Sequence, residues 1–180
     1  TFNAEGGGYG IAPLKNGKVT INGGTFNAGL LNWGGSIVVT GGTFKADPTA
    51  YLAEGYYASK NGSYYEVKEG SLVSSAEALA AAFNKGGDVI LNANITVNET
   101  VVLAEGKTVV LDLNGKTISH NDESKKYAIN NHGTLTIKDS NGKGSINARG
   151  IYNGYGNGEN NTATAKIIVE SGTINAKGTD

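Results

Sequence analysis

One repeated string constrains the fold of this chain more than any other feature of its sequence. A short apolar run, two small residues, Thr or Ser, a large apolar residue, a polar residue and Ala follow one another in residues 19–28, 37–46 and 167–176. Residues 111–119 and 135–148 are looser copies. Because a single short repeat cannot bury its apolar face alone, the copies are expected to stack into a shared core.

The spacing of the copies predicts which residues lie side by side. In three copies, the residue that follows the turn recurs at successive steps of 28 residues, at Thr117, Ser145 and Thr173. In two other copies the step is 18 residues, from Thr25 to Thr43. A constant motif at variable spacing indicates constant strands that are joined by loops of different length.

Within each copy, apolar and polar residues alternate as they do in a strand with one buried face. Val19 and Ile21 are expected to point inward and Thr20 outward. Upstream of each apolar run lies a further short apolar segment, so each repeat holds three short strands separated by Asn and Gly turns. This pattern predicts an all-β fold, a parallel β-helix or β-solenoid. The predicted interior column contains Ile118, Ile146, Ile174, Phe26 and Phe44, and a predicted polar ladder contains Asn131, Asn153 and Asn32.

Two segments depart from the repeat, and both are predicted to be caps. Residues 74–77 (Ser-Ser-Ala-Glu) form a capping box at the start of a short amphipathic helix, which Gly86 and Gly87 end. Asp47 and Pro48 are expected to open a single helical turn. These features predict one short capping α-helix in addition to the strands.

The second cap is a predicted β-hairpin. Two Tyr-rich runs, residues 56–60 and 63–67, flank Asn61-Gly62, which is a strong signal for a two-residue turn. This turn would pair Ser59 with Tyr64. Tyr56, Ala58, Tyr65 and Val67 would then share one face, which would cover the open end of a solenoid and protect its edge strand.

The order of the two caps predicts the domain organisation. Residues 1–46 are expected to be terminal coils of a β-helix and residues 47–70 its helical turn and hairpin cap. Residues 71–87 would form the N-terminal capping helix of the next β-helix, or of the same one in permuted order, and residues 88–180 its first coils. The chain is therefore interpreted as one frame of a tandem or polymeric array.

The same coils resemble a known class of proteins. Ser74-Ser-Ala-Glu-Ala-Leu79, followed by residues 89–95 and 111–118, resembles the right-handed β-helix repeats of large bacterial surface proteins, which are adhesin-like and pectin-lyase-like in fold. Residues 41–56 look like the way such helices end in secreted proteins of gut-type bacteria. The resemblance implies a right-handed helix and an extracellular or cell-surface location.

Composition narrows the classes of function. A net charge of -1 lacks the basic surface that nucleic acids require, and no apolar run is long enough to insert in a membrane. The chain has no Cys, so disulfides, thiolate metal sites and a Cys nucleophile are excluded. With 28 Gly, 2 Pro and 17% charged residues, the composition is that of a folded, turn-rich chain.

Several polar residues are of types that act as catalytic or metal-binding groups. Polysaccharide-cleaving enzymes of the pectin-lyase-like class use clustered aspartates, whereas the aspartates here are scattered, although stacking of coils leaves a close pair open. His132 is interpreted as a turn residue and Arg149 as an exposed charge. The loop from Asp139 to Gly144 is interpreted as a turn and not as a calcium site, because Lys143 occupies a position where a calcium ligand is needed. The aspartates concerned are Asp88, Asp112, Asp122 and Asp139. No catalytic residue, cofactor or metal ligand is therefore assigned.

The remaining candidates for contact with a ligand are aromatic. Exposed rings stack on sugars, but half of these rings belong to the predicted hairpin, where packing is the favoured role. The candidate capping or contact residues are Trp33, Tyr56, Tyr57, Tyr64 and Tyr65, together with Tyr152 and Tyr155 as further rings that could stack on sugars.

Taken together, these features predict a non-catalytic structural module of an extracellular bacterial stalk, fibre or filament. Its expected partners are neighbouring copies of the same module. A carbohydrate-binding adhesin is the alternative, with glycans as partners, and a pectin-lyase-like enzyme is a third possibility.

Overall fold

The chain is divided into two compact units, each with its own core. The computed structural model describes residues 1, 3, 9–154 and 164–177. Contacts separate unit 1, Thr1–Gly70, from unit 2, Ser71–Asp180. Buried apolar side chains form one cluster in each unit, so the units are described in turn.

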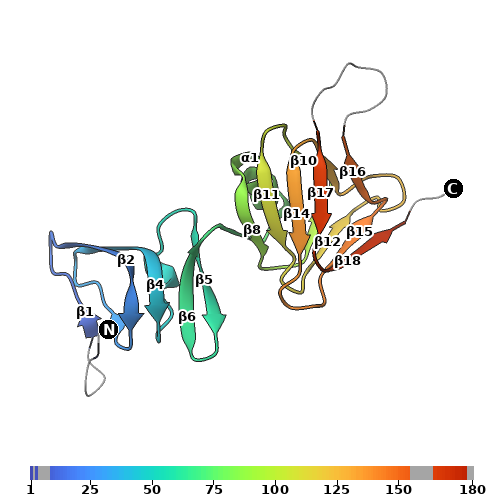
Figure 1. Cartoon of the computed structure of the whole chain (residues 1–180). Coiled ribbons are helices and arrows are strands. Elements are labelled where there is room, and N and C mark those ends of the chain that lie inside the picture. Colours follow the sequence, from blue (N-terminus) through green and yellow to red (C-terminus); the bar gives the residue numbers. More distant parts are fainter. Residues whose placement is uncertain (2, 4–8, 155–163, 178–180) are drawn as a thin grey trace. The chain divides into compact units, whose positions relative to one another are not determined.

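Unit 2 is built from three parallel sheets, which the chain visits in turn (Figure 1). The first sheet has the order β17-β14-β11-β8-β7, the second β18-β15-β12-β9 and the third β10-β13-β16. The strands are β7 (Ser71–Val73), β8 (Gly87–Leu91), β9 (Ile95–Val97), β10 (Val101–Leu103), β11 (Thr108–Asp112), β12 (Thr117–His120), β13 (Ile129–Asn131), β14 (Thr134–Lys138), β15 (Ser145–Ala148), β16 (Ile151–Asn153), β17 (Lys166–Val169) and β18 (Thr173–Ala176). Because the chain returns to the first sheet after passing through the other two, the arrangement is consistent with an all-β solenoid, and we call each passage a coil.

The predicted spacing of 28 residues is confirmed in the second sheet. Thr117 pairs with Ser145, and Ser145 pairs with Thr173. The inward residues Ile118 and Ile146 are fully buried in register with each other. Ile174 continues this column but is 38% exposed, because it lies in the last strand of its sheet.

The short helix α1 (Ala76–Lys85) packs on the first coil of unit 2, as the sequence predicts for a cap. Leu79 and Phe83 are fully buried in the unit 2 core. The N-cap is Ser75, whose hydroxyl accepts a hydrogen bond from the N–H of Ala78 at 3.2 Å. The predicted capping box, which begins at Ser74, is therefore displaced by one residue.

Gly86 ends the helix in a conformation that suits glycine. Its φ is +85°, in the region that side chains disfavour, and its N–H donates to the carbonyl of Ala82. The chain then enters β8 directly, so the helix and the first strand of the coil are joined without a loop.

Unit 1 contains two stacked coils and a hairpin. The long strands β2 (Lys18–Phe26) and β4 (Ser36–Phe44) are parallel neighbours, and the shorter β1 (Tyr9–Ile11) and β3 (Gly29–Leu30) form a second parallel pair. Thr25 pairs with Thr43, which confirms the predicted spacing of 18 residues. The 3₁₀ turn η2 (Thr49–Tyr51) lies where Asp47 and Pro48 predict a helical turn.

The predicted hairpin is present in unit 1 as β5 (Tyr56–Asn61) and β6 (Tyr64–Glu69). Strand β6 pairs antiparallel with β4 and so occupies the edge of β4 that β2 leaves free. The predicted hairpin register is wrong by two positions: Asn61 pairs with Tyr64, and Ser59 pairs with Glu66. The turn consists of Gly62 and Ser63, because Gly62 supplies the positive φ of +60°.

A shift of two positions leaves each side chain on its predicted face. Tyr56, Ala58 and Tyr65 pack against the unit 1 core, and Val67 is part of it. The predicted packing face of the hairpin is therefore confirmed.

The predicted interior column is divided between the two units. Phe26 and Phe44 stack on each other in unit 1, with ring centroids 4.6 Å apart and planes inclined by 8°. The Ile118 column belongs to unit 2, so within one chain the predicted residues lie in two separate cores and not in one continuous column. The polar ladder is divided in the same way: Asn131 donates to Asn153 at 2.7 Å in unit 2, whereas Asn32 is an exposed residue of unit 1.

Candidate functional site

The aromatic residues selected from the sequence do not gather in one place. Trp33 is 59% exposed, and its backbone forms a bridge with Leu14, which is 64% exposed. Tyr9 is a further exposed ring of unit 1, at 56%. Trp33 and Leu14 therefore form a small outward apolar area on neighbouring segments of unit 1.

The four tyrosines of the hairpin divide between its two faces. Tyr56 and Tyr65 contact the unit 1 core, and the ammonium group of Lys60 lies 5.7 Å from the centre of the Tyr65 ring. Tyr64 donates a hydrogen bond from its hydroxyl to Oδ1 of Asn27 at 3.0 Å, and Tyr57 is partly buried. Tyr155 lies outside the described residues.

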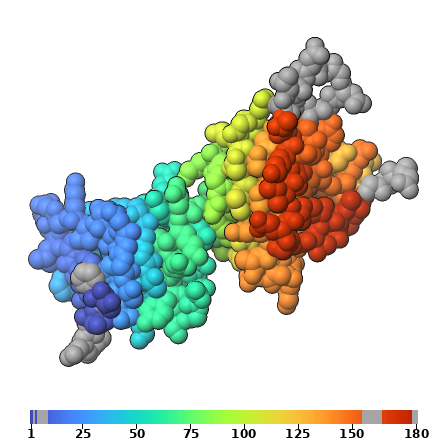
Figure 2. Space-filling view, in the orientation of Figure 1, coloured from blue at the N-terminus to red at the C-terminus, as the bar shows by residue number. Residues whose placement is uncertain are grey.

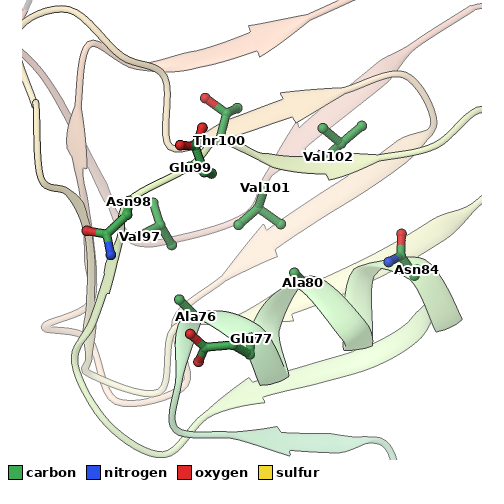
Figure 3. Close-up of a pocket in the computed structure, with 10 residues that line it drawn as sticks. All are labelled: Ala76, Glu77, Ala80, Asn84, Val97, Asn98, Glu99, Thr100, Val101 and Val102. Atoms are coloured by element: carbon green, nitrogen blue, oxygen red, sulfur yellow. The ribbon is translucent and has the colours of Figure 1, made fainter.

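A groove lies in unit 2 between α1 and the segment that leads into β10 (Figure 3). Its volume is about 390 Å³. Ala76, Ala80 and Asn84 project from α1 toward the strand that carries Val101, whose side chain points back at the helix (Figure 3). The groove therefore has apolar walls that are formed by the helix and the first coil.

Two exposed carboxylates, Glu77 and Glu99, belong to the groove lining. The Glu77 carboxylate accepts hydrogen bonds from its own backbone N–H and from the Ser75 hydroxyl, and both lower its pKa. The lining hydroxyl, that of Thr100, donates to the carbonyl of Tyr127 at 2.8 Å. The groove thus holds acidic groups but no nucleophile paired with a base among its described lining residues.

Two of the aspartates that are scattered in the sequence lie in neighbouring turns of unit 2. Asp112 and Asp139 are each only 7% exposed. Oδ1 of Asp112 accepts from the N–H of Asn114 at 2.8 Å and from that of Ser140 at 3.0 Å, and so links two successive turns. Stacking of the coils therefore brings these two turns together, which is the arrangement that the sequence leaves open for aspartates of different coils.

Backbone N–H groups surround Asp139. Its carboxylate accepts from Gly115 at 2.7 Å, from Asn141 at 3.4 Å and from Gly144 at 2.5 Å. Burial raises the pKa of Asp139, but hydrogen bonds from these N–H groups and from that of Gly142 outweigh burial and hold the pKa below its ordinary value. A carboxylate held in this way stabilises a turn, which agrees with the interpretation of residues 139–144 as a turn.

The remaining polar candidates lie apart from one another. Asp88 is exposed on β8, and Asp122 lies in the turns after β12. His132 follows β13 in a bend and is partly buried. Among the described residues, no group of three or more His, Asp and Glu side chains lies close enough to hold a metal ion.

One cluster in unit 2 was missed by reasoning from the sequence. The guanidinium carbon of Arg149 lies 5.3 Å from the centre of the Tyr127 ring. The ring of Tyr152 lies 5.3 Å from that of Tyr127, inclined by 57°. Ile129 pairs with Ile151 in the next coil, and the same spacing in sequence places Tyr127 beside Arg149. Aligning these two isoleucines in the sequence would therefore have found the cluster.

Comparisons with known proteins give no relative: no family model, curated protein or solved structure matches this chain. Across residues 9–154 and 164–177, no helix combines the length and the apolar character that crossing a membrane requires. Inference about function therefore depends on the residues themselves.

Proposed function

We propose that this chain is a non-catalytic structural repeat module of an extracellular bacterial stalk, fibre or filament, and that copies of it associate end to end. We further propose that its coils form a right-handed parallel β-helix. Right-handed crossovers between parallel strands are strongly preferred in proteins, which supports this hand. The resemblance to β-helix repeats of bacterial surface proteins supports the location.

The observation that carries this proposal is the uncovered apolar surface of the last described coil of unit 2. Val169 is 49% exposed, although Ile137, its partner in the preceding coil, is fully buried. Ile174 is 38% exposed, although its partner Ile146 is fully buried. Figure 2 shows this coil, in red, at the surface of unit 2. Exposed apolar side chains that continue interior columns are suited to cover by a further coil.

The spacing of strands supports a second copy as the source of that coil. In the last coil, Lys166 and Thr173, the first residues of β17 and β18, are seven positions apart. In unit 1, Lys18 and Thr25 in β2 have the same separation. The two segments therefore place their apolar residues at matching positions, which stacking in register requires.

The two alternative functions are a polysaccharide-cleaving enzyme and a carbohydrate-binding adhesin. A polysaccharide-cleaving enzyme needs two carboxylates that are free to act on substrate. The carboxylates of Asp112 and Asp139 are instead occupied by backbone N–H groups, so this pair gives that function no support. A carbohydrate-binding adhesin is favoured by the Tyr127 cluster.

Sedimentation velocity and negative-stain electron microscopy over a concentration series test the proposal. We expect the wild type to form linear oligomers that grow with concentration, and Ile174→Asp to stay monomeric, because a charge would enter the stacking surface. Val102→Asp is the matched control, since Val102 is 46% exposed on the outer face of β10. A wild type that is monomeric throughout, or an Ile174→Asp variant that assembles as the wild type does, would overturn the proposal. Circular dichroism establishes that each variant is folded.

A further inference from the structure

The outer face of the third sheet of unit 2 carries one residue from each coil in register. Val102 in β10 pairs with Asn130 in β13, which pairs with Tyr152 in β16. Paired residues of adjacent strands point to the same side of a sheet. Val102 is 46% exposed, and Asn130 and Tyr152 are partly exposed. This column runs across the coils as an apolar and amide surface that ends in an aromatic ring.

Tyr127 and Arg149 extend this surface at the start of the same strands. The Arg149 guanidinium lies over the Tyr127 ring at 5.3 Å, and the Tyr152 ring is in contact with the same Tyr127 ring. Tyr127 is held in turn through its carbonyl, which accepts from the hydroxyl of Thr100. Stacking on an aromatic ring restricts the guanidinium before any ligand arrives. We call Tyr127, Asn130, Arg149 and Tyr152 the Arg149 face.

Within the part of the chain that the structure describes, the positive charge of Arg149 is not paired with a carboxylate. The ion pairs found among the described residues are Lys68 with Glu66 and Lys177 with Glu123, and neither involves Arg149. The N–H of Arg149 donates to the carbonyl of Lys126, which is also an exposed residue. An anionic ligand would therefore meet an exposed guanidinium that forms no ion pair with any carboxylate of the described residues.

The face also holds an acceptor without a donor. Oδ1 of Asn130 is buried from solvent and has no hydrogen-bond partner in the described structure. An oxygen that water does not reach is equally closed to a hydroxyl group of a ligand, so Asn130 contributes to the face only through the exposed part of its side chain.

We propose that the Arg149 face binds an acidic saccharide unit, a uronic acid or a sugar of similar charge. The carboxylate would pair with the fork of the Arg149 guanidinium, which suits two parallel hydrogen bonds. The apolar side of the sugar ring would lie against Tyr152, next to the partly exposed Asn130 with which Tyr152 is paired. A stalk that associates end to end does not need this face, so the inference goes beyond the proposed structural function.

Two sugars that differ in one group test this proposal on the whole chain. Methyl β-D-glucuronide carries a carboxylate where methyl β-D-glucoside carries a hydroxymethyl group. We expect a titration followed by ¹H–¹⁵N correlation spectra to move the resonances of Tyr127, Asn130 and Tyr152 with the glucuronide. The glucoside should cause much smaller shifts at the same concentration. Raising the salt concentration should weaken the binding of the glucuronide, because screening acts on exposed charges.

Variants then assign the binding to its residues. Arg149→Gln should weaken glucuronide binding by about 10- to 100-fold, the range for a lost hydrogen bond to a charged group. Tyr152→Ala should weaken it by about 2- to 12-fold through lost stacking. Lys143→Gln, which removes an exposed cation from a different turn of unit 2, is the matched control and should bind as the wild type does.

The possible outcomes separate the inference from its alternatives. Equal binding of both sugars, no binding of either, or equal losses in Arg149→Gln and Lys143→Gln would each overturn it. N-acetylglycine serves as a single carboxylate without a sugar ring, and binding as tight as that of the glucuronide would assign the face to simple ion pairing and overturn the proposal too. Thermal melts monitor folding of each variant, and Arg149→Lys, which keeps the charge but loses the fork, should give an intermediate affinity.

Discussion

Truncation of Phe44 tests whether unit 1 has a core of its own. Phe44 is 2% exposed and stacks on Phe26 with ring centroids 4.6 Å apart. Replacing a buried Phe by Ala costs about 3–5 kcal/mol in well-packed cores. A unit that ends at Gly70 is expected to have a free energy of unfolding of roughly 4–10 kcal/mol at about 0.05–0.15 kcal/mol per residue. Phe44→Ala should therefore remove a third or more of the stability of unit 1.

Hydrogen exchange read by mass spectrometry resolves this effect unit by unit. Peptides from β2 and β4 should lose protection in Phe44→Ala, whereas peptides from β11 and β14 should keep it, because the buried clusters of the two units share no residue. Val38→Ala on β4 is the matched control, since Val38 is 40% exposed and its truncation should change stability by less than about 0.5 kcal/mol. Equal loss of protection in both units, or wild-type protection of β2 and β4, would refute the reasoning.

Three further predictions concern unit 2. Asp139→Asn should lower the melting temperature of unit 2 at neutral pH, and the difference from wild type should shrink on acidification. The reason is that a carboxylate with a lowered pKa stabilises the fold above the ordinary Asp pKa, and this contribution is lost as the pH falls through the folded-state pKa. A difference in melting temperature that is constant from pH 7 to pH 2 would contradict this prediction. Ser75→Ala should cost about 1 kcal/mol in chemical denaturation through loss of the helix N-cap, and an unchanged midpoint would speak against that role. Gly133→Ala should destabilise unit 2 by about 1–3 kcal/mol. A Cβ at position 133 would lie 2.7 Å from the carbonyl oxygen of Ala104 and would also clash with the carbonyl oxygen of Lys107. A melting temperature equal to that of the wild type would exclude this clash.

Much of the strand framework could be predicted from the sequence because a coil repeat leaves a strong local signal. The position of Thr or Ser after each turn gave the register of Thr117, Ser145 and Thr173, and the structure pairs these residues. Alternation within each run placed Ile118 and Ile146 inside. Both inferences depend only on the period of strands and on residues close together in the chain.

The predictions that differ from the structure concern positions where two alternatives fit the sequence pattern almost equally well. Asn61-Gly62 and Gly62-Ser63 can each supply a two-residue turn, and the pairing of Asn61 with Tyr64 selects the second. Ser74 and Ser75 are both suitable N-caps, and the helix begins after Ser75. Phe26 and Ile118 follow the same motif, so the motif cannot reveal that they belong to different cores.

The candidate sites were harder to predict, because they arise from residues of different coils. Asp112 accepts a hydrogen bond from the turn that follows Asp139, and Arg149 lies over Tyr127. In both cases the separation in sequence depends on the lengths of the loops between coils. Conversely, the tyrosines of the hairpin are close in sequence but divide between two faces, and Tyr56 and Tyr65 serve the core. Proximity in sequence was therefore a poor guide to proximity on the surface.

The antiparallel pairing of β6 with β4 gives unit 1 a direction. Hydrogen bonds between antiparallel strands are spaced differently from those between parallel strands, so a parallel coil cannot continue the ladder past the hairpin in the same pattern. Parallel growth of unit 1 is left only to the side of β2. Any assembly that extends unit 1 by parallel stacking would therefore be polar, with two chemically distinct ends.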